Sequence, residues 1–119
     1  MSDNSAPAAC VGAQSNAGTG ECFERMSEEA DRKLNQVYSE IQHELEAEHR
    51  QKVADYLRIA QKRWIAFRDA NCDAAQEMYK GGTAGPVNGA ACVEATTRHR
   101  TEELEVEYGI FLQWGGFAK

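Results

Sequence analysis

The sequence has few prolines and no apolar run long enough to cross a membrane. No stretch approaches the roughly 18 consecutive apolar residues that a spanning helix needs. With two prolines and 42% apolar residues in 119, the chain also differs in composition from disordered and fibrous proteins. We therefore expect a globular protein with room for one domain.

Positive charge is scarce as well. Thirteen Lys and Arg residues stand against nineteen Asp and Glu residues, which gives a formal net charge of −6 and a sequence pI near 5.0. A surplus of negative charge disfavours the phosphate backbone of nucleic acids and anionic membrane surfaces as ligands. The composition favours a basic protein partner.

Motifs for catalysis and metal binding are absent. The three histidines, His43, His49 and His99, do not have the HExxH spacing of a zinc site, and the sequence contains neither GxSxG nor GxxxxGK[ST]. The glutamates between Glu40 and Glu48 could attract a cation near His43, but runs of charge usually form a solvated face. We expect no enzyme activity, no bound metal and no cofactor.

The four cysteines indicate an oxidising compartment. Cys10, Cys22, Cys72 and Cys92 form an even set in a short chain, without the CxxC spacing of zinc sites. Disulfides are favoured over free thiols, which predicts a periplasmic or secreted protein. The start, Met1-Ser2-Asp3, does not look like a signal peptide. We interpret the sequence as a mature form whose export signal is replaced by a Met, with residues 1–9 as a flexible tail and 10–119 as one domain.

Apolar residues recur every three or four positions in three segments, which predicts an all-α fold. The first stripe is Met26, Ala30, Leu34, Val37, Ile41 and Leu45. The second is Val53, Leu57, Ala60, Trp64 and Phe67. The third is Val93, Thr97, Thr101, Leu104, Tyr108 and Phe111.

The ends of these helices follow from caps and glycines. Either Ser27 or Thr19 would cap the first helix, Gly81 and Gly82 would end the second at Tyr79 or Lys80, and Gly115 would end the third. The glycine-rich residues 80–89 are expected to form a loop. These boundaries describe a small antiparallel three-helix up-down-up bundle.

No glycine or proline separates the first two stripes. A turn near residues 47–51 is favoured, because one helix over 27–79 would be about 80 Å long and could not bury its own stripe. The alternative is a continuous long helix that dimerises, and a weak homodimer stays open in either case.

Three pairings of the four cysteines are possible, and we favour Cys10–Cys22 with Cys72–Cys92. The second bond would join two antiparallel helix ends across the glycine-rich loop and would contribute about 3 kcal/mol in the chain-entropy model. The first would fold the segment before the first helix back onto it.

Four sequence elements, in the correct order, resemble a known family. Residues 60–72, AQKRWIAFRDANC, resemble an AQ..W..(F/Y)RDA.C signature, and residues 30–38, ADRKLNQVY, resemble its AD..LN..Y element. Downstream, Gly81-Gly82-Thr83, Cys92, Thr97-Arg98 and Leu104 complete the order. Over residues 10–108 the chain looks like the LprI-type lysozyme-inhibitor domain family. The resemblance implies a helical, cysteine-bridged, exported protein, and inhibition of lysozyme is attached to a named member.

A polar network is expected around Arg68, which lies four residues from both Trp64 and Cys72, beside the apolar seam. A guanidinium there needs a carboxylate, from Asp31 or Asp69. Asn35, Gln61 and Arg98 are the further members that we expect. We interpret the network as structural, with a ligand-binding arginine as the alternative reading.

The glycine-rich loop is the main candidate for partner binding, through Lys80, Gly81, Gly82 and Thr83. Held by the 72–92 bond, it would be a pre-organised finger whose docking costs little entropy; otherwise it is a simple connector. Trp114 and Phe117 either pack back on the bundle or anchor a partner. We therefore expect an exported bacterial interaction protein, a lysozyme inhibitor or an envelope-stress binder, with a periplasmic module that binds small molecules or cell-wall fragments as the alternative.

Overall fold

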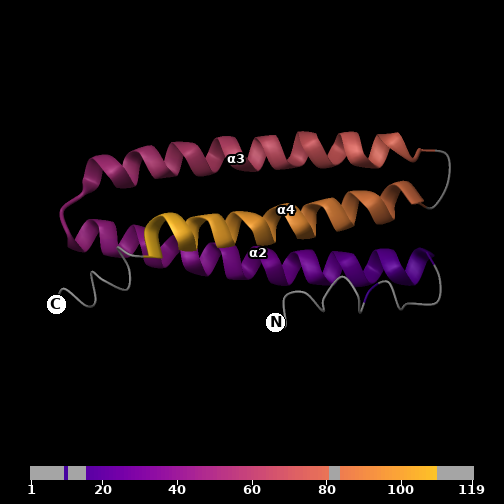
Figure 1. Cartoon of the computed structure of the whole chain (residues 1–119), viewed down its shortest axis with the longest axis horizontal. Helices are drawn as coiled ribbons and strands as arrows, with labels where there is room; N and C mark the ends of the chain where they lie inside the picture. The colour runs from indigo at the N-terminus through magenta and orange to yellow at the C-terminus, as the bar shows by residue number, and fades with distance from the viewer. Residues whose placement is uncertain (1–9, 11–15, 81–83, 110–119) are drawn as a thin grey trace.

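Three long helices make up the part of the chain that the computed structural model describes, which is residues 10, 16–80 and 84–109. They are α2 (Asn16–Ala47), α3 (Gln51–Met78) and α4 (Ala84–Gly109) (Figure 1). These described residues contain no strand, so the all-α prediction is confirmed. No helix among them is long and apolar enough to cross a lipid bilayer.

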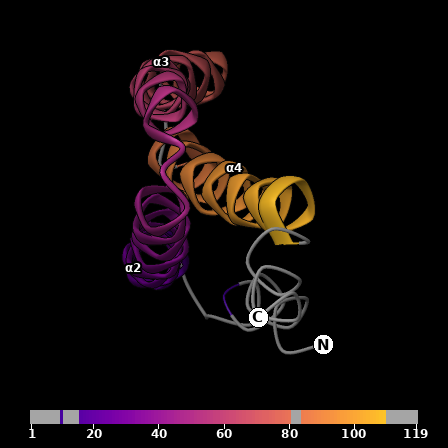
Figure 2. The same cartoon turned by 90° about the vertical axis from the view of Figure 1, so that its left-hand side faces the viewer.

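The helices run up, down and up, with α4 between the other two (Figures 1 and 2). Helix α4 packs closely against α2 and also against α3, whereas α2 and α3 contact each other little. One side of α3 therefore has no other described helix beside it. The predicted antiparallel bundle is confirmed, in an open form.

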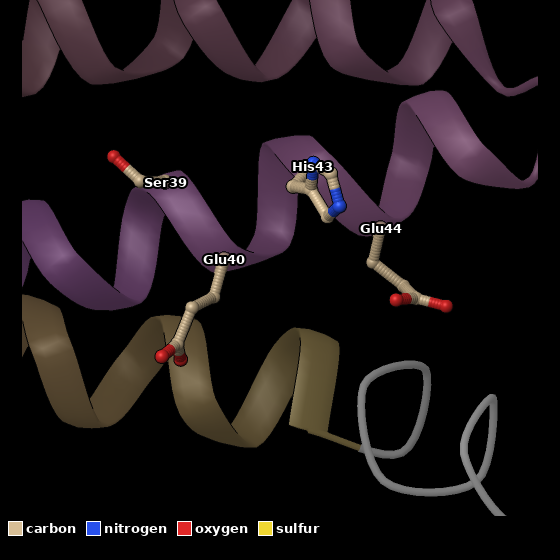
Figure 3. A pocket seen from close by; sticks show the side chains of 4 residues that line it. All are labelled: Ser39, Glu40, His43 and Glu44. Atoms are coloured by element: carbon tan, nitrogen blue, oxygen red, sulfur yellow. The ribbon is translucent and has the colours of Figure 1, made fainter.

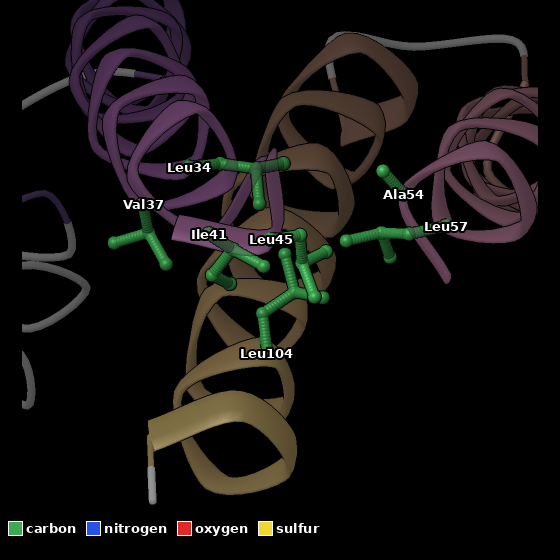
Figure 4. Close-up of a cluster of buried hydrophobic side chains, with 7 residues drawn as sticks. All are labelled: Leu34, Val37, Ile41, Leu45, Ala54, Leu57 and Leu104. Carbon is green, nitrogen blue, oxygen red and sulfur yellow. The ribbon is translucent and has the colours of Figure 1, made fainter. Parts of the chain in front are cut away.

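The apolar core lies near the turn between α2 and α3. It consists of seven buried residues, Leu34, Val37, Ile41, Leu45, Ala54, Leu57 and Leu104. Four of them come from the predicted stripe of α2, whose spacings of three and four place them on one helix face. Figure 4 shows Leu45, Leu57 and Leu104 at the point where the three helices meet. Burial of each leucine, isoleucine and valine side chain in this set stabilises the fold by about 1.5 to 3 kcal/mol relative to exposure.

The turn between α2 and α3 falls where the sequence predicts it. Arg50 N donates to Leu45 O at 2.8 Å, and His49 N donates to Glu46 O at 3.1 Å. These are the two hydrogen bonds of a Schellman cap. The cap needs a left-handed residue, and His49 takes that place with φ 59°. A histidine thus occupies a position that glycine adopts without strain, which explains why no glycine signals this turn in the sequence.

We expect His49→Gly to stabilise the protein by about 0.5 to 1 kcal/mol, because glycine removes the steric strain of the left-handed conformation. Urea unfolding followed by circular dichroism measures this change. The matched control is His43→Gly, within α2, which should lose about 0.5 kcal/mol through helix propensity. Equal destabilisation by both substitutions would contradict the strain argument.

The buried face of α3 differs from the prediction. The predicted stripe included Val53 and Phe67, yet their side chains are 36% and 60% exposed. The residues that α3 buries are Ala54, Leu57, Gln61 and Cys72. Helix α3 turns a face of mixed polarity toward α4, so apolar spacing placed Leu57 and Trp64 correctly and Val53, Ala60 and Phe67 incorrectly.

The predicted loop over residues 80–89 is wrong beyond Thr83, because α4 begins at Ala84. Gly85 and Gly89 are buried where α4 approaches the end of α3. A Cβ on Gly85 would lie 3.0 Å from the carbonyl oxygen of Gln76, and one on Gly89 would lie 2.7 Å from Gln76 Oε1. These glycines permit close helix packing, although in the sequence they look like loop residues.

Helix α2 also begins earlier than expected, at Asn16.

We expect Gly85→Ala to destabilise the protein by about 1 kcal/mol, because the added methyl group meets backbone that can move only with α3. The control is Gly109→Ala, where a Cβ would have nothing within 4 Å. Thermal unfolding of both variants tests the expectation. A melting temperature of Gly85→Ala at or above that of the control would contradict this expectation. It would show that α3 and α4 can move apart without a loss of stability.

Candidate functional site

Two disulfides fasten one end of the bundle. Cys10–Cys22 has a Cα–Cα distance of 5.3 Å, and Cys72–Cys92 has one of 5.4 Å. This is the favoured pairing, which is confirmed. Cys72 lies late in α3 and Cys92 early in α4, and a Cβ on Gly20 of α2 would lie 3.6 Å from Val87 Cγ2 of α4. The start of α2, the end of α3 and the start of α4 therefore meet at what we call the stapled end.

Arg68 joins all three helices next to the stapled end. Its Nη1 donates to Asp31 Oδ1 of α2 and to Thr97 Oγ1 of α4, both at 3.3 Å, and its Nε donates to Asp69 Oδ1 at 3.0 Å. The side chain is only 13% exposed. Partial burial strengthens each charge-assisted hydrogen bond and makes the loss of a partner costly.

Trp64 lies under two guanidinium groups. The Cζ of Arg68 is 5.3 Å from the centroid of the ring, and the Cζ of Arg100 is 5.8 Å from it. Arg100 Nε donates to Oε1 of the buried Gln61 at 3.0 Å, and its Nη1 donates to Glu103 Oε1 at 2.6 Å. Cation–π contacts and ion pairs together connect α3 to α4 here.

The structure thus brings five of the residues proposed for the polar network together: Asp31, Gln61, Trp64, Arg68 and Asp69. Arg98 forms an ion pair with the buried Glu94 one turn earlier on α4, at 3.0 Å. Asn35 is exposed on α2 and makes no hydrogen bond to these groups.

Sequence reasoning missed Arg100, which links Trp64 to α4. The signal was present, since Arg100 lies three residues after Thr97 and four before Leu104, both on the predicted stripe of α4. We call the groups that bridge the helices here the arginine seam: Asp31, Gln61, Trp64, Arg68, Asp69, Thr97, Arg100 and Glu103.

The arginine seam is suited to holding helices in register. Arg68 donates to three partners and Arg100 to two, so both guanidinium groups are engaged within the chain. A shallow surface hollow does exist, but it lies elsewhere, on the outer side of α2, lined by Ser39, Glu40, His43 and Glu44 (Figure 3). Within the described ranges, no three His, Cys, Asp or Glu residues are placed to hold a metal ion.

Charge is distributed unevenly among the helices. Helix α2 carries eight acidic and three basic residues, α4 carries five and two, and α3 carries four and five. The two helices that pack most closely are thus both acidic, with net charges of −5 and −3, while α3 is +1.

Near the end of α4, partial burial and then the charge of Glu107 raise the pKa of Tyr108, against the opposing effect of Arg100.

Lys80 follows α3 directly at the stapled end. Its Nζ lies 2.9 Å from Glu77 Oε2, and both side chains are exposed. Gly81, Gly82 and Thr83, the other loop residues proposed for partner binding, lie outside the described residues, as do Trp114 and Phe117.

We expect Arg68→Ala to destabilise the protein by about 2 to 3 kcal/mol, because it leaves Asp31 and Thr97 without their shared donor and uncovers Trp64. The control is Arg32→Ala, which removes an exposed ion pair to Glu29 and should change stability by less than about 0.5 kcal/mol. Urea unfolding of both variants provides the comparison. Similar midpoints would mean that the arginine seam contributes nothing to holding the helices.

Comparison with known proteins gives one family and one relative. The family model described as "Lysozyme inhibitor LprI" matches residues 10–104. An uncharacterized protein of Rhizobium meliloti (strain 1021) is 28% identical over 105 residues, covering 81% of this chain and 76% of that protein. No solved structure matches the chain. The matched range contains both disulfides and all of the arginine seam.

Proposed function

The chain belongs to the LprI lysozyme-inhibitor family, and on that ground we propose that it is an extracytoplasmic protein that inhibits lysozyme. The family match is the observation that carries the proposal. The disulfides support the compartment, because such bonds persist in the periplasm and outside the cell and are rare in the cytosol. The periplasm or the extracellular space is therefore the proposed location.

The charge distribution supports a basic partner. A net charge of −6, concentrated on α2 and α4, attracts a cationic lysozyme over distances of about 8 Å at physiological salt. Such attraction mainly raises the association rate and contributes less to the lifetime of a complex. We assign this attraction to the exposed carboxylates of α2 and α4.

We propose the stapled end as the surface that contacts the enzyme, through Lys80 and the adjacent Gly81, Gly82 and Thr83. The cleft of lysozyme holds two carboxylates, which an ammonium group and backbone N–H groups can approach as donors. Lys80 would have to leave Glu77, but an exposed ion pair of this kind is worth about 1 kcal/mol or less. The Cys72–Cys92 bond limits the conformational freedom that binding would otherwise remove.

The alternative function, binding of small molecules or cell-wall fragments at Arg68 and Trp64, has less support. Arg68 already donates to Asp31, Asp69 and Thr97. A ligand would have to displace one of these partners from a guanidinium that is largely buried. A ligand site needs an open, convergent set of polar groups, and the paired arginine does not offer one.

The direct test is inhibition of cell-wall lysis by purified lysozymes, titrated with the disulfide-bonded protein. We expect inhibition at low salt that weakens as salt rises, because ions screen the attraction between opposite charges. Lack of inhibition at tens of micromolar at low salt, with several lysozymes, would remove the specific proposal while leaving the fold and family intact.

Two variants with equal net charge locate the contact. Glu21→Gln/Glu24→Gln/Glu28→Gln removes three exposed carboxylates at the stapled end, and Glu102→Gln/Glu105→Gln/Glu107→Gln removes three at the opposite end of α4. We expect the first set to slow association with lysozyme about tenfold and the second set to have a smaller effect, because screening limits the reach of distant charges. Surface plasmon resonance measures both rates. A larger effect of the second set would contradict a contact at the stapled end and indicate one at the opposite end of the bundle.

A further inference from the structure

Helix α3 carries a continuous stripe of exposed residues, of which Asn71 also touches α4, where its Nδ2 donates to Cys92 Sγ at 3.9 Å. Its members are Tyr56, Ala60, Arg63, Phe67, Asn71, Ala74 and Met78, and all seven are exposed. The three large apolar side chains, Tyr56, Phe67 and Met78, are 67%, 60% and 79% exposed. We call this set the α3 stripe. Its spacings of three and four residues place it along one side of the helix over about 33 Å.

The stripe is uncovered because of how α3 packs. The buried residues of the helix, including Leu57, Gln61 and Cys72, lie on another side, toward α4. Helix α3 lies at the edge of the bundle, with α4 between it and most of α2 (Figure 2). The large apolar side chains Tyr56, Phe67 and Met78 recur every eleven residues along this side, an arrangement that one facing helix can cover.

The α3 stripe is self-complementary about Phe67. Residues at equal distances on either side of it match: Ala60 and Ala74 lie seven residues away, and Tyr56 and Met78 lie eleven residues away. Two copies of α3 packed antiparallel around a twofold axis at Phe67 would place Tyr56 against Met78 of the second copy. Such an isologous contact uses the same patch on both subunits, as most homodimers do.

The polar members of the stripe match in the same arrangement. Arg63 and Asn71 lie four residues before and after Phe67, so the guanidinium of one copy would face the carboxamide oxygen of the other, whose Nδ2 donates to Cys92 Sγ of its own chain. An amide oxygen accepts from a guanidinium without bringing like charges together. The alanines between the large residues let the helix axes approach to within about 8 to 10 Å.

Charge favours α3 as the contact between two copies. Helices α2 and α4 carry net charges of −5 and −3, so a contact through either would bring like charges together. Helix α3 is +1, and the α3 stripe contains no carboxylate. Among the described helices, α3 is the one that two acidic chains can place face to face with the least repulsion.

We propose that the α3 stripe is the interface of an antiparallel homodimer, with Phe67 on the twofold axis. The inference does not depend on lysozyme binding. An interface made by one helix from each subunit lies at the small end of specific interfaces, near or below about 1,200 Å². The dimer is therefore weak, and it forms at micromolar or higher concentration.

Sedimentation equilibrium of the disulfide-bonded protein over a concentration series up to about 0.5 mM tests the proposal. The weight-average mass should rise from 13.2 kDa toward twice that value. Phe67→Glu should stay monomeric, because it places two carboxylates together at the axis. Ile65→Glu is the matched control, the same change at an exposed residue of α3 outside the stripe, and it should dimerise like the parent. Circular dichroism confirms that both variants fold.

Asn71→Asp tests the register of the helices. In the proposed dimer it creates two ion pairs with Arg63 of the facing copy, so association should tighten about fivefold and this gain should shrink in high salt. Added negative charge would instead weaken any other contact between two acidic chains. A parent protein that stays monomeric at about 0.5 mM, a Phe67→Glu variant that still dimerises, or weaker association of Asn71→Asp would each overturn the proposal.

Discussion

The Cys72–Cys92 bond holds together the half of the bundle that has the least apolar core. The seven-residue cluster is concentrated near the turn, around Leu45, Leu57 and Leu104. Beyond Leu57, the buried positions of α3 are Gln61 and Cys72, and those of α4 at the same level include Glu94 and Thr97. Groups of this kind supply little hydrophobic stabilisation. The Cys72–Cys92 bond, with a sequence separation of 20, offsets this lack of hydrophobic stabilisation. In the chain-entropy model it contributes about 3 kcal/mol to the stability of the fold.

The arginine seam becomes necessary in the same region. Between the apolar cluster and the disulfides, Arg68 and Arg100 take the place that leucines would occupy in a conventional bundle. Their hydrogen bonds are directional, so they fix the rotation of α3 against α4. Apolar side chains alone could pack in several registers. The disulfide supplies stability at this end, and the seam supplies orientation.

Much of this fold could be predicted from the sequence because α2 follows simple rules. Its stripe from Leu34 to Leu45 is apolar at every buried position, and the four cysteines are spaced so that the favoured pairing closes two short loops. The inner face of α3 could not be predicted in this way, since hydrophobic spacing cannot identify a face built from glutamine, arginine and cysteine.

Other features were hidden for a different reason. Gly85 and Gly89 looked like loop residues, but they serve close helix packing, and a single sequence does not distinguish these two uses of glycine. His49 likewise has a left-handed backbone conformation, which in a sequence is usually marked by a glycine. At the candidate site, spacing places Arg68 beside the seam, and Asp31 and Asp69 were the expected carboxylates. Arg98 pairs with Glu94 of its own helix, whereas the contact of Arg100 with Gln61 depends on which side chains α3 presents.

The polar interior also determines where this protein can act. Because Arg68 and Arg100 are paired within the chain and lie over the ring of Trp64, we expect recognition to take place on outer surfaces. The same packing turns Gln61 and Cys72 inward and leaves Tyr56, Phe67 and Met78 outside. The surfaces then differ in charge: α2 and α4 are acidic and suit a cationic partner through long-range attraction, whereas α3 has a net charge near zero and exposes three large apolar side chains that suit contact at short range. In the proposed dimer, α3 would make the contact between copies, and the acidic helices would stay free for an enzyme.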